Sequence, residues 1–384
     1  MAEPSPFGAG NPERPSLRYV FLRFLRYGFL AWGGPVAQIG LMHRELVERD
    51  GWVEEGRFRK TLALYQALPG PEAHELTVWF GMLKRGRVGG LLAGLGFMLP
   101  GVVLVTLLAA AYVAFAQTSA VAETLLYGVR PAVLALIAFA FWRLAKHGLN
   151  GWDLALVGVL AAAVGLLAPQ VSFLLVLLAG GLLILAARAG RGVAPALLVL
   201  GASFPALTLA GMGALAVLSA KVGLLTFGGA YTAIPFLREG AVEQQAWMTD
   251  DQFLDALALT GLVPGPLIAI GTFVGYVAAG WAGALLATVI IFTPAFAFTL
   301  VGHGFFERIV GEPRLHAFLL GVTAAVIGLI VAATVPLAQA AVHDLPTLLL
   351  ALAALGALAS KRVPIPVVIL GAAAAGGLVA WAGG

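Results

Sequence analysis

The sequence has no cysteine and few charged residues. Without cysteine the chain forms no disulfide bond and offers no thiolate metal ligand or redox thiol. Asp, Glu, Lys and Arg make up 11% of the 384 residues, whereas a typical soluble protein has roughly 25%. The six histidines show no His-Glu-x-x-His spacing, and the Gly-x-x-x-x-Gly-Lys-Ser/Thr pattern of a nucleotide-binding loop is missing. We therefore expect neither a cofactor nor a metal, and no direct use of ATP.

Hydrophobic residues take the place of the missing charge: they account for 60% of the chain, and the mean hydropathy is +0.96. Several apolar runs reach the length of about 20 residues that a helix needs to cross a bilayer. They are too long and too uniform for barrel strands, which alternate over about ten residues. The pattern predicts an all-α polytopic membrane protein. Residues 1–16 form a polar tail without the features of a cleaved signal.

The second half of the sequence repeats the first. Gly33-Gly34 recurs as Gly228-Gly229, and Pro69-Gly70-Pro71 recurs as Pro264-Gly265-Pro266, both at a shift of 195 positions. Other matched pairs are Trp52 with Trp247, Phe58 with Phe253 and, after a one-residue slip, Gly81 with Gly275, Gly86 with Gly280 and Pro100 with Pro294. Chance similarity between apolar runs does not explain glycine, proline and tryptophan recurring at fixed spacing.

Each half contains about six apolar segments, and one unmatched segment lies between them. We expect the segments near 17–43, 58–83, 89–116, 122–142, 152–168, 171–187, 193–210, 213–237, 252–277, 283–306, 316–341, 345–359 and 363–382. Because six is even, the extra helix turns the second half over, which predicts inverted-topology repeats as in many secondary transporters. The predicted division is a tail (1–16), a first repeat (17–190), a linking transmembrane helix (191–212) and a second repeat (213–384).

The loop charges favour a cytoplasmic N-terminus by the positive-inside rule. Lys and Arg gather in alternate loops, for example at 84–87, 143–146, 188–191, 238 and 361–362, and are missing from the loops between them. The stretch 44–60 breaks the alternation, because it holds five basic and five acidic residues. Either it packs as a charged helical hairpin, or the first two segments do not fully cross.

The repeated Pro-Gly-Pro predicts a broken helix in each half. Proline removes a backbone donor and glycine lets the chain swing, so Pro71 and Pro266 are expected to begin new half-helices. A helix start deep in the membrane presents free amides and a positive dipole end, which suits an anion. A simple structural kink is the alternative. The Gly-Gly pairs at Gly33-Gly34 and Gly228-Gly229 are either a second break that faces the ligand or a site of close helix packing.

Three basic residues lie within these segments. Arg26 and Lys221 match at the same shift of 195, and Arg130 lies inside the fourth segment. Since a buried charge in a membrane is costly, such residues are candidate ligands for an anion, unless they extend to the interface.

Acidic residues occur after the first Pro-Gly-Pro only. Glu72, His74 and Glu75 stand there, whereas the second copy has Leu267 and Ile270 in place of the acids. The acids either complement the helix dipole, or a buried Glu72 carries a proton coupled to transport.

At these motifs the sequence resembles the chromate ion transporter family. The resemblance rests on Phe24-Leu-Arg-Tyr-Gly-Phe-Leu-Ala-Trp-Gly-Gly-Pro-Val-Ala, Leu68-Pro-Gly-Pro-Glu-Ala, Lys221-Val-Gly-Leu-Leu-Thr-Phe-Gly-Gly-Ala-Tyr and Val263-Pro-Gly-Pro. It covers nearly the whole chain beyond residue 16. It implies two homologous halves of opposite topology, export of chromate from the bacterial cytoplasm across the inner membrane, and chromate resistance. Trp32 before Gly-Gly and the pair His74-Glu75 depart from the family's usual residues.

The leading interpretation is therefore a secondary transporter for a tetrahedral dianion, chromate or sulfate, and not an enzyme. An anion channel is the alternative, since paired broken helices also suit a pore. A membrane enzyme has only the cluster of Glu72, His74 and Glu75 in its favour. The expected partners are the oxyanion and the bilayer but no nucleic acid, and the sequence leaves a homodimer open.

Overall fold

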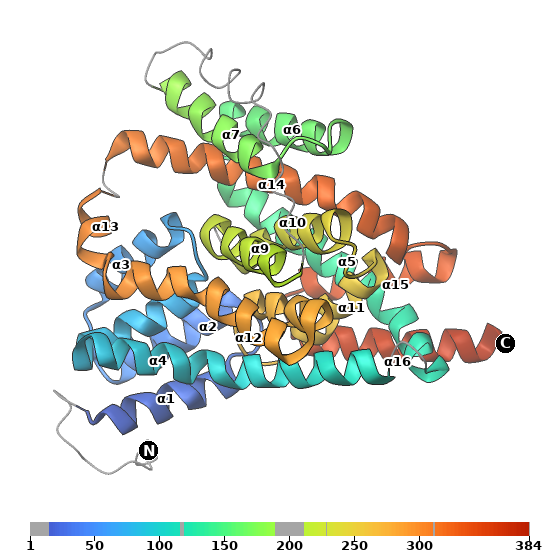
Figure 1. Ribbon diagram of the computed structural model, residues 1–384, viewed down its shortest axis with the longest axis horizontal. Coiled ribbons are helices and arrows are strands. Elements are labelled where there is room, and N and C mark those ends of the chain that lie inside the picture. Colours follow the sequence, from blue (N-terminus) through green and yellow to red (C-terminus); the bar gives the residue numbers. More distant parts are fainter. Residues whose placement is uncertain (1–14, 116–118, 189–210, 228, 310–311, 384) are drawn as a thin grey trace.

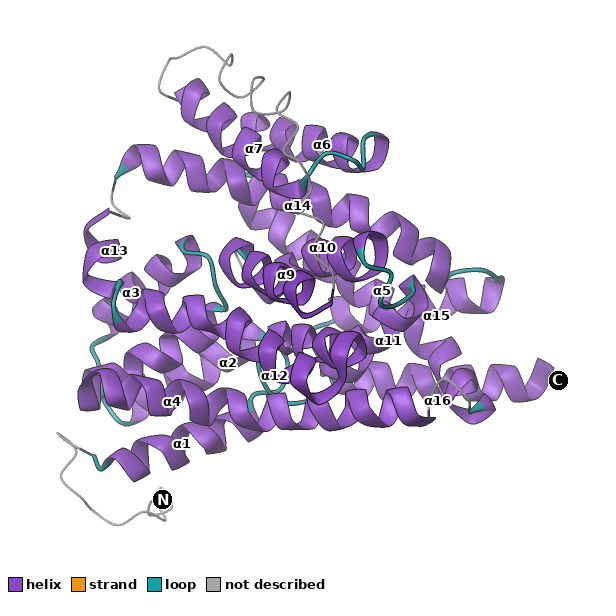
Figure 2. Ribbon diagram, viewed as in Figure 1, coloured by secondary structure: helices purple, strands orange, loops and turns teal. Residues whose placement is uncertain are grey.

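The protein is an assembly of helices in the computed structural model, which describes residues 15–115, 119–188, 211–227, 229–309 and 312–383 (Figures 1 and 2). Over those residues the β-structure amounts to one isolated bridge, between Pro69 and Phe227. Four helical stretches are long and apolar enough to cross a membrane: Glu72–Phe115, Ala122–Gly148, Leu267–Leu300 and Pro313–Ala341. The prediction of an all-α, multi-pass membrane protein is confirmed. The segment expected at 193–210 lies outside the described residues.

The helices follow the same order in the two halves. The first half has α1 (Leu17–Leu30), α2 (Pro35–Met42), a π-helical turn (His43–Arg49), α3 (Glu55–Ala67), α4 (Glu72–Phe115), α5 (Ala120–Gly148), α6 (Trp152–Leu167) and α7 (Phe173–Arg188). The second has α9 (Gly211–Leu225), a 3-10 turn (Ala230–Thr232), α10 (Ala233–Arg238), a π-helical turn (Glu239–Gln244), α11 (Asp250–Gly261), a 3-10 turn (Leu267–Ala269), α12 (Ile270–Leu300), α13 (His303–Ile309), α14 (Pro313–Ala341), α15 (Leu345–Ala359) and α16 (Ile365–Gly383).

Helices α4 and α12 are each a tight hairpin of two antiparallel arms. The backbone leaves the helical conformation at Arg85-Gly86 in α4, where Gly86 has φ 61°. A Cβ placed on Gly81 would overlap the carbonyl oxygen of Gly89, although residues eight apart on a straight helix are about 12 Å apart. Gly275 and Gly283 repeat this contact in α12. Glycine is needed at these positions because the two arms touch through their backbones.

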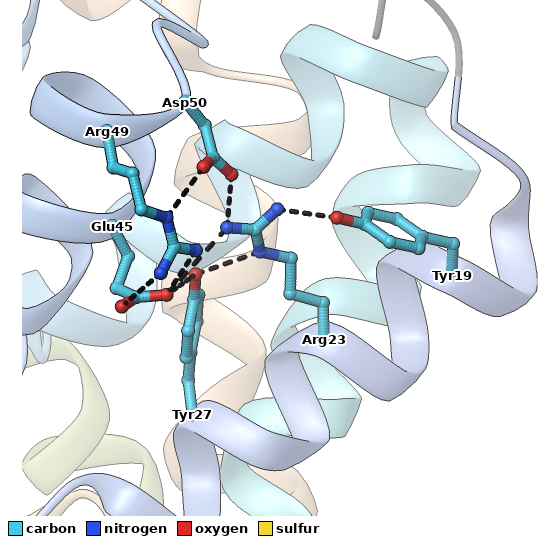
Figure 3. Close-up of polar contacts among 6 residues, drawn as sticks. All are labelled: Tyr19, Arg23, Tyr27, Glu45, Arg49 and Asp50. Atoms are coloured by element: carbon cyan, nitrogen blue, oxygen red, sulfur yellow. Dashed lines mark hydrogen bonds and ion pairs between the residues drawn. The ribbon is translucent and has the colours of Figure 1, made fainter. Parts of the chain in front are cut away.

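The first apolar segment turns back at Gly33-Gly34 and does not continue as one straight helix. Arg23 on α1 forms an ion pair with Asp50 (Figure 3). The guanidinium carbon of Arg23 also lies 5.1 Å from the centre of the Trp52 ring. The start of α1 and the turn after residue 49 are therefore neighbours. Lys84, at the turn of α4, also lies over the Trp52 ring, at 5.3 Å.

The second segment turns back in the same way at Pro69-Gly70-Pro71. The rings of Phe58 on α3 and Phe80 on α4 stack with their centroids 6.1 Å apart. The stretch 44–60 is thus the charged turn between two segments that each fold back on themselves. Its charges pair with one another and with Arg23, as Figure 3 shows for Glu45, Arg49 and Asp50.

The corresponding turn of the second half has the same construction. His43 pairs with Glu48 and Glu55, and at the shift of 195 Arg238 pairs with Glu243 and Asp250. The backbone agrees too, because Trp52 N–H donates to Leu46 O and Trp247 N–H donates to Ala241 O. The sequence repeat is therefore also a structural repeat.

The two halves are interleaved through their later helices. Helix α5 packs against α15 and α16 of the other half, while α14 packs against α6 and α7 (Figure 1). The small residues Gly128 and Gly376 allow α5 and α16 to touch, and Gly180 and Gly321 do the same for α7 and α14. Each half therefore packs one long helix, α5 or α14, against the last two helices of the other half.

Candidate functional site

The broken segments of the two halves meet each other. Gly70 N–H donates to the carbonyl of Thr226 at 2.7 Å, and Gly265 N–H donates to the carbonyl of Ala31 at 3.2 Å. Both donors and both acceptors are related by the shift of 195. Each Pro-Gly-Pro break is thus hydrogen-bonded to the Gly-Gly break of the other half. Unwound backbone is tolerated deep in a membrane only when protein or a water-filled cavity satisfies it, and here the breaks satisfy each other.

The breaks need glycine for conformational reasons. Gly70 has φ +146° and Gly265 has φ +133°, which an L-residue with a Cβ rarely adopts. A Cβ on Gly265 would also lie 3.0 Å from Cα of Gly101 on α4. The new helices begin just after the prolines: Pro71 accepts hydrogen bonds from the amides of His74 and Glu75. Pro266 likewise precedes the turn that leads into α12.

A buried glutamine forms hydrogen bonds to the Gly-Gly break of the first half and the Pro-Gly-Pro break of the second half. The side-chain amide of Gln38 on α2 donates to the carbonyl of Gly265 at 2.7 Å and to that of Ala31 at 3.3 Å. Its side chain is 1% exposed. Nothing in the repeat pattern marks Gln38, because the second half has alanine at the corresponding position 233.

Two small cavities lie beside these breaks. The larger has a volume of about 70 Å³, several times the ~10–15 Å³ that one water requires. The smaller, of about 20 Å³, shares Gly33, Tyr231 and Ile365 with it. The larger is lined by Gly33, Pro35, Val36, Glu72, Phe139, Ala140, Arg143, Leu144, Gly229, Tyr231 and Ile365. Residues of both halves therefore line both cavities, beside the points where the two halves unwind.

Two features of the larger cavity are favourable to an anion. Arg143, near the end of α5, is the one basic side chain in its lining. Helix α2 starts there at Pro35 with Gly34 as its cap residue and no side chain capping it, so its first amides have no acceptor within the helix. Glu72 is the one acid in the lining and is 7% exposed. A cavity with one basic side chain, a helix start and one acid suits an anion whose binding depends on the protonation of that acid.

The structure brings part of the predicted site to these cavities. Gly33, Gly34, Glu72, Gly229 and Gly265 line one or both of them. Pro69, Gly70, Pro71, Pro264 and Pro266 form the breaks themselves. Gly228 lies outside the described residues.

The three predicted cations lie away from the cavities. Arg26 is on an exposed face of α1, and Lys221 on α9 is close enough to Glu239 for their charges to interact. Arg130 forms a two-pronged ion pair with Asp255 on α11, at 2.9 Å from Nε to Oδ1 and 3.0 Å from Nη2 to Oδ2. Asp255 is fully buried, so the charge of Arg130 is already balanced.

Sequence reasoning missed Arg143 and Tyr231. Arg143 stands at the end of an apolar run, and the loop-charge pattern therefore placed it in a cytoplasmic loop. It lies on the same helix as Arg130, 13 positions later, or about 20 Å at 1.5 Å per residue.

His74 and Glu75 are fully buried but do not line either cavity. The His74 ring has its centroid 5.0 Å from that of Phe292 and 4.8 Å from that of Phe296. The Glu75 carboxylate lies under Gly70, where a Cβ would stand 2.8 Å from Oε1. The cluster that favoured an enzyme is thus split, with only Glu72 facing the cavity.

Comparison with known proteins agrees with the repeat. The model of a family described as Chromate transporter matches the chain twice, over residues 18–185 and 213–377. No solved structure matches the chain.

Three relatives match nearly the whole chain. A chromate transport protein of Pseudomonas aeruginosa is 45% identical, covering 96% of this chain and 94% of the relative. A chromate transport protein of Cupriavidus metallidurans is 35% identical, covering 95% and 94%. A probable chromate transport protein of Synechococcus elongatus is 33% identical, covering 95% and 96%.

Proposed function

The chain belongs to the chromate transporter family, and we propose that it carries chromate, or an oxyanion of like shape and charge such as sulfate, by alternating access. The family is one of transporters and not of enzymes. The observation that carries the proposal is the cavity lined by residues of both halves beside their breaks, with Arg143 and the start of α2 in its lining.

The cavity offers a dianion two positive contacts and one adjustable acid. A helix start acts as roughly half a positive charge, and a guanidinium can donate two parallel hydrogen bonds to an oxyanion. An ionised Glu72 repels the anion, so we propose that the carboxyl is protonated when the anion is bound.

We further propose that the two repeats, 17–190 and 213–384, have inverted topology. Support comes from the reciprocal hydrogen bonds between the breaks and from the exchange of helix partners around α5 and α14. Both follow from a two-fold relation between the halves. The re-entrant segments of the first half then open to one side of the membrane and those of the second half to the other.

This arrangement places the charged turn at 44–60 on the cytoplasmic side, together with the N-terminus and Lys84. The contacts of Trp52 with Arg23 and Lys84 support that placement. The exception at 44–60 then disappears, because re-entrant segments do not reverse the side of the chain. The turn around Arg238 moves to the outer side, where Arg238 becomes the exception; its charge is paired with Glu243 and Asp250. We also propose the bacterial inner membrane as the location, with a cytoplasmic N-terminus, and a homodimer as the assembly.

A carrier fits the geometry better than a channel. The breaks are joined by hydrogen bonds across the halves, and the two cavities beside them measure about 70 Å³ and 20 Å³, so the hydrogen-bonded breaks leave little space between the halves. We propose that this space opens to one side at a time when the paired breaks separate.

The test is transport by the purified chain in proteoliposomes. Uptake of labelled chromate should saturate, and trapped unlabelled chromate should speed the entry of the label. Sulfate should compete. Uptake that stays linear with concentration and shows no such exchange would contradict a carrier and favour the channel.

A further inference from the structure

One buried acid plays no part in lining the cavity. Both carboxylate oxygens of Glu75 are buried and lack a hydrogen-bond partner among the described residues. Glu75 lies three positions after Glu72 on α4, and residues so spaced share one helix face. A buried acid without a partner in a membrane protein is costly, and such residues commonly serve ion or proton pathways.

A line of titratable side chains leads outward from Glu75. Tyr65, fully buried on α3, lies across the Pro-Gly-Pro break and near enough to interact with the charge of Glu75. The hydroxyl of Tyr65 is 3.1 Å from Nδ1 of His303. His303 is half-buried at the start of α13.

The outer end of this line meets exposed charges. Glu307 on α13 and Arg57 on α3 are both exposed and both act electrostatically on His303. The groups that face the line are thus Glu72 from α4, Thr299 from α12, Arg57 from α3 and Glu307 from α13. Glu72 is at its inner end, in the cavity.

The second half has no such line. The positions that correspond to Glu72, Glu75 and Tyr65 are Leu267, Ile270 and Thr260. Ala109 corresponds to His303 at the shift of 194 that relates Pro100 to Pro294. The second repeat forms the same broken hairpin without these groups, so the fold does not need them.

We propose that His303, Tyr65 and Glu75 form a one-sided proton path between Glu72 and the side of the membrane on which α13 begins. The inference rests on the proposed function and adds its coupling ion. A proton taken up by the His303 ring passes to the Tyr65 oxygen while the Tyr65 proton moves on to Glu75 by way of an intervening water, since the Glu75 oxygens make no direct hydrogen bond among the described residues. Glu75 then passes a proton to Glu72 in the same water-mediated way. A neutral Glu72 lets the anion bind near Arg143, and loss of that proton to the path expels the anion.

Two measurements on the full-length protein in proteoliposomes test the path. One is chromate counterflow at equal pH on both sides, which needs only substrate binding and the conformational change. The other is net chromate flux driven by a pH gradient at zero membrane potential. In Glu75→Gln and Tyr65→Phe we expect counterflow within about twofold of the wild type and pH-driven flux reduced at least tenfold. Glu75→Ile introduces the side chain that the second repeat has at the corresponding position, Ile270. It should give the same result as Glu75→Gln. Glu123→Gln removes an exposed acid on α5 and serves as the control, with both rates unchanged.

The outcomes separate the two proposals. Wild-type counterflow combined with full pH-driven flux in the Glu75 and Tyr65 variants overturns the path and leaves the proposed function standing. A wild-type protein that shows counterflow but whose net flux does not respond to a pH gradient also overturns the path and leaves the proposed function standing. Equal loss of both rates in all three variants, each eluting as a single folded species, assigns these residues to binding and also overturns the path. A folded wild type that exchanges no oxyanion overturns the proposed function itself.

Discussion

Replacing Arg143 by glutamine tests the cavity most sharply. Arg143 is the one basic residue in the cavity lining, and glutamine keeps much of its length while removing the charge. A hydrogen bond to a charged group contributes about 1.5–3 kcal/mol, and about 1.4 kcal/mol corresponds to a factor of ten. We therefore expect the KM for chromate to rise roughly 10- to 150-fold. Arg143→Lys keeps the charge but loses the paired donors, so its KM should lie between those of the wild type and Arg143→Gln.

The assay is the concentration dependence of labelled chromate uptake into proteoliposomes. Lys146→Gln is the matched control, because Lys146 is exposed on the same helix and lies over the Trp142 ring. It should leave KM unchanged. If Arg143→Gln takes up chromate with a KM within twofold of the wild type, Arg143 does not bind the anion and the cavity is assigned wrongly.

Three further changes should affect stability, which thermal unfolding in detergent measures. Gly265→Ala places a side chain at φ +133° against facing backbone and should lower the free energy of unfolding by at least about 1–3 kcal/mol. Gly56→Ala is the control, because a Cβ there meets open space, and it should change stability little. Equal losses in the two variants would show that Gly265 is not needed to avoid strain. Arg130→Ala leaves Asp255 buried without its cation, with the Tyr112 hydroxyl still donating to it at 2.9 Å, and should lower the free energy of unfolding by about 3–5 kcal/mol. Replacing both Arg130 and Asp255 by leucine should lower it less; if the double variant is the less stable one, the ion pair is itself stabilising. Burial raises the pKa of Glu239, in the turn between α10 and α11, to about 7 from 4.5. The protonated carboxyl is favoured in the folded state, so stability should fall as the pH rises from about 4.5 to about 7. Glu239→Gln should abolish that fall. If the variant keeps the pH profile of the wild type, Glu239 is not its cause.

The repeat and its breaks were predictable because they depend on local chemistry. Glycine and proline act on their own backbone, so Gly33-Gly34 and Pro69-Gly70-Pro71 mark the breaks wherever the rest of the chain goes. The direction that the chain takes after a break depends on contacts with residues far away in the sequence. Apolar length shows that a segment enters the membrane, but not that Asp50 returns to the side of Arg23. That return explains the charges at 44–60, which the sequence left with two interpretations.

The site was harder to predict because its contacts are non-local. Arg130 seemed a free cation in the membrane, since its partner Asp255 is 125 positions away. Arg143 seemed a loop charge because it ends an apolar run. Burial of a charge depends on which helices surround it, and α5 is surrounded by helices of the other repeat.

The most direct test of the central claim is exchange through the reconstituted protein. Proteoliposomes loaded with unlabelled chromate are diluted into labelled chromate, with and without external sulfate, for the wild type and Arg143→Gln. The cavity between the repeats predicts saturable uptake of the label that trapped chromate accelerates, sulfate competes with and Arg143→Gln weakens. Uptake by the folded wild type that neither saturates nor responds to trapped chromate would contradict it.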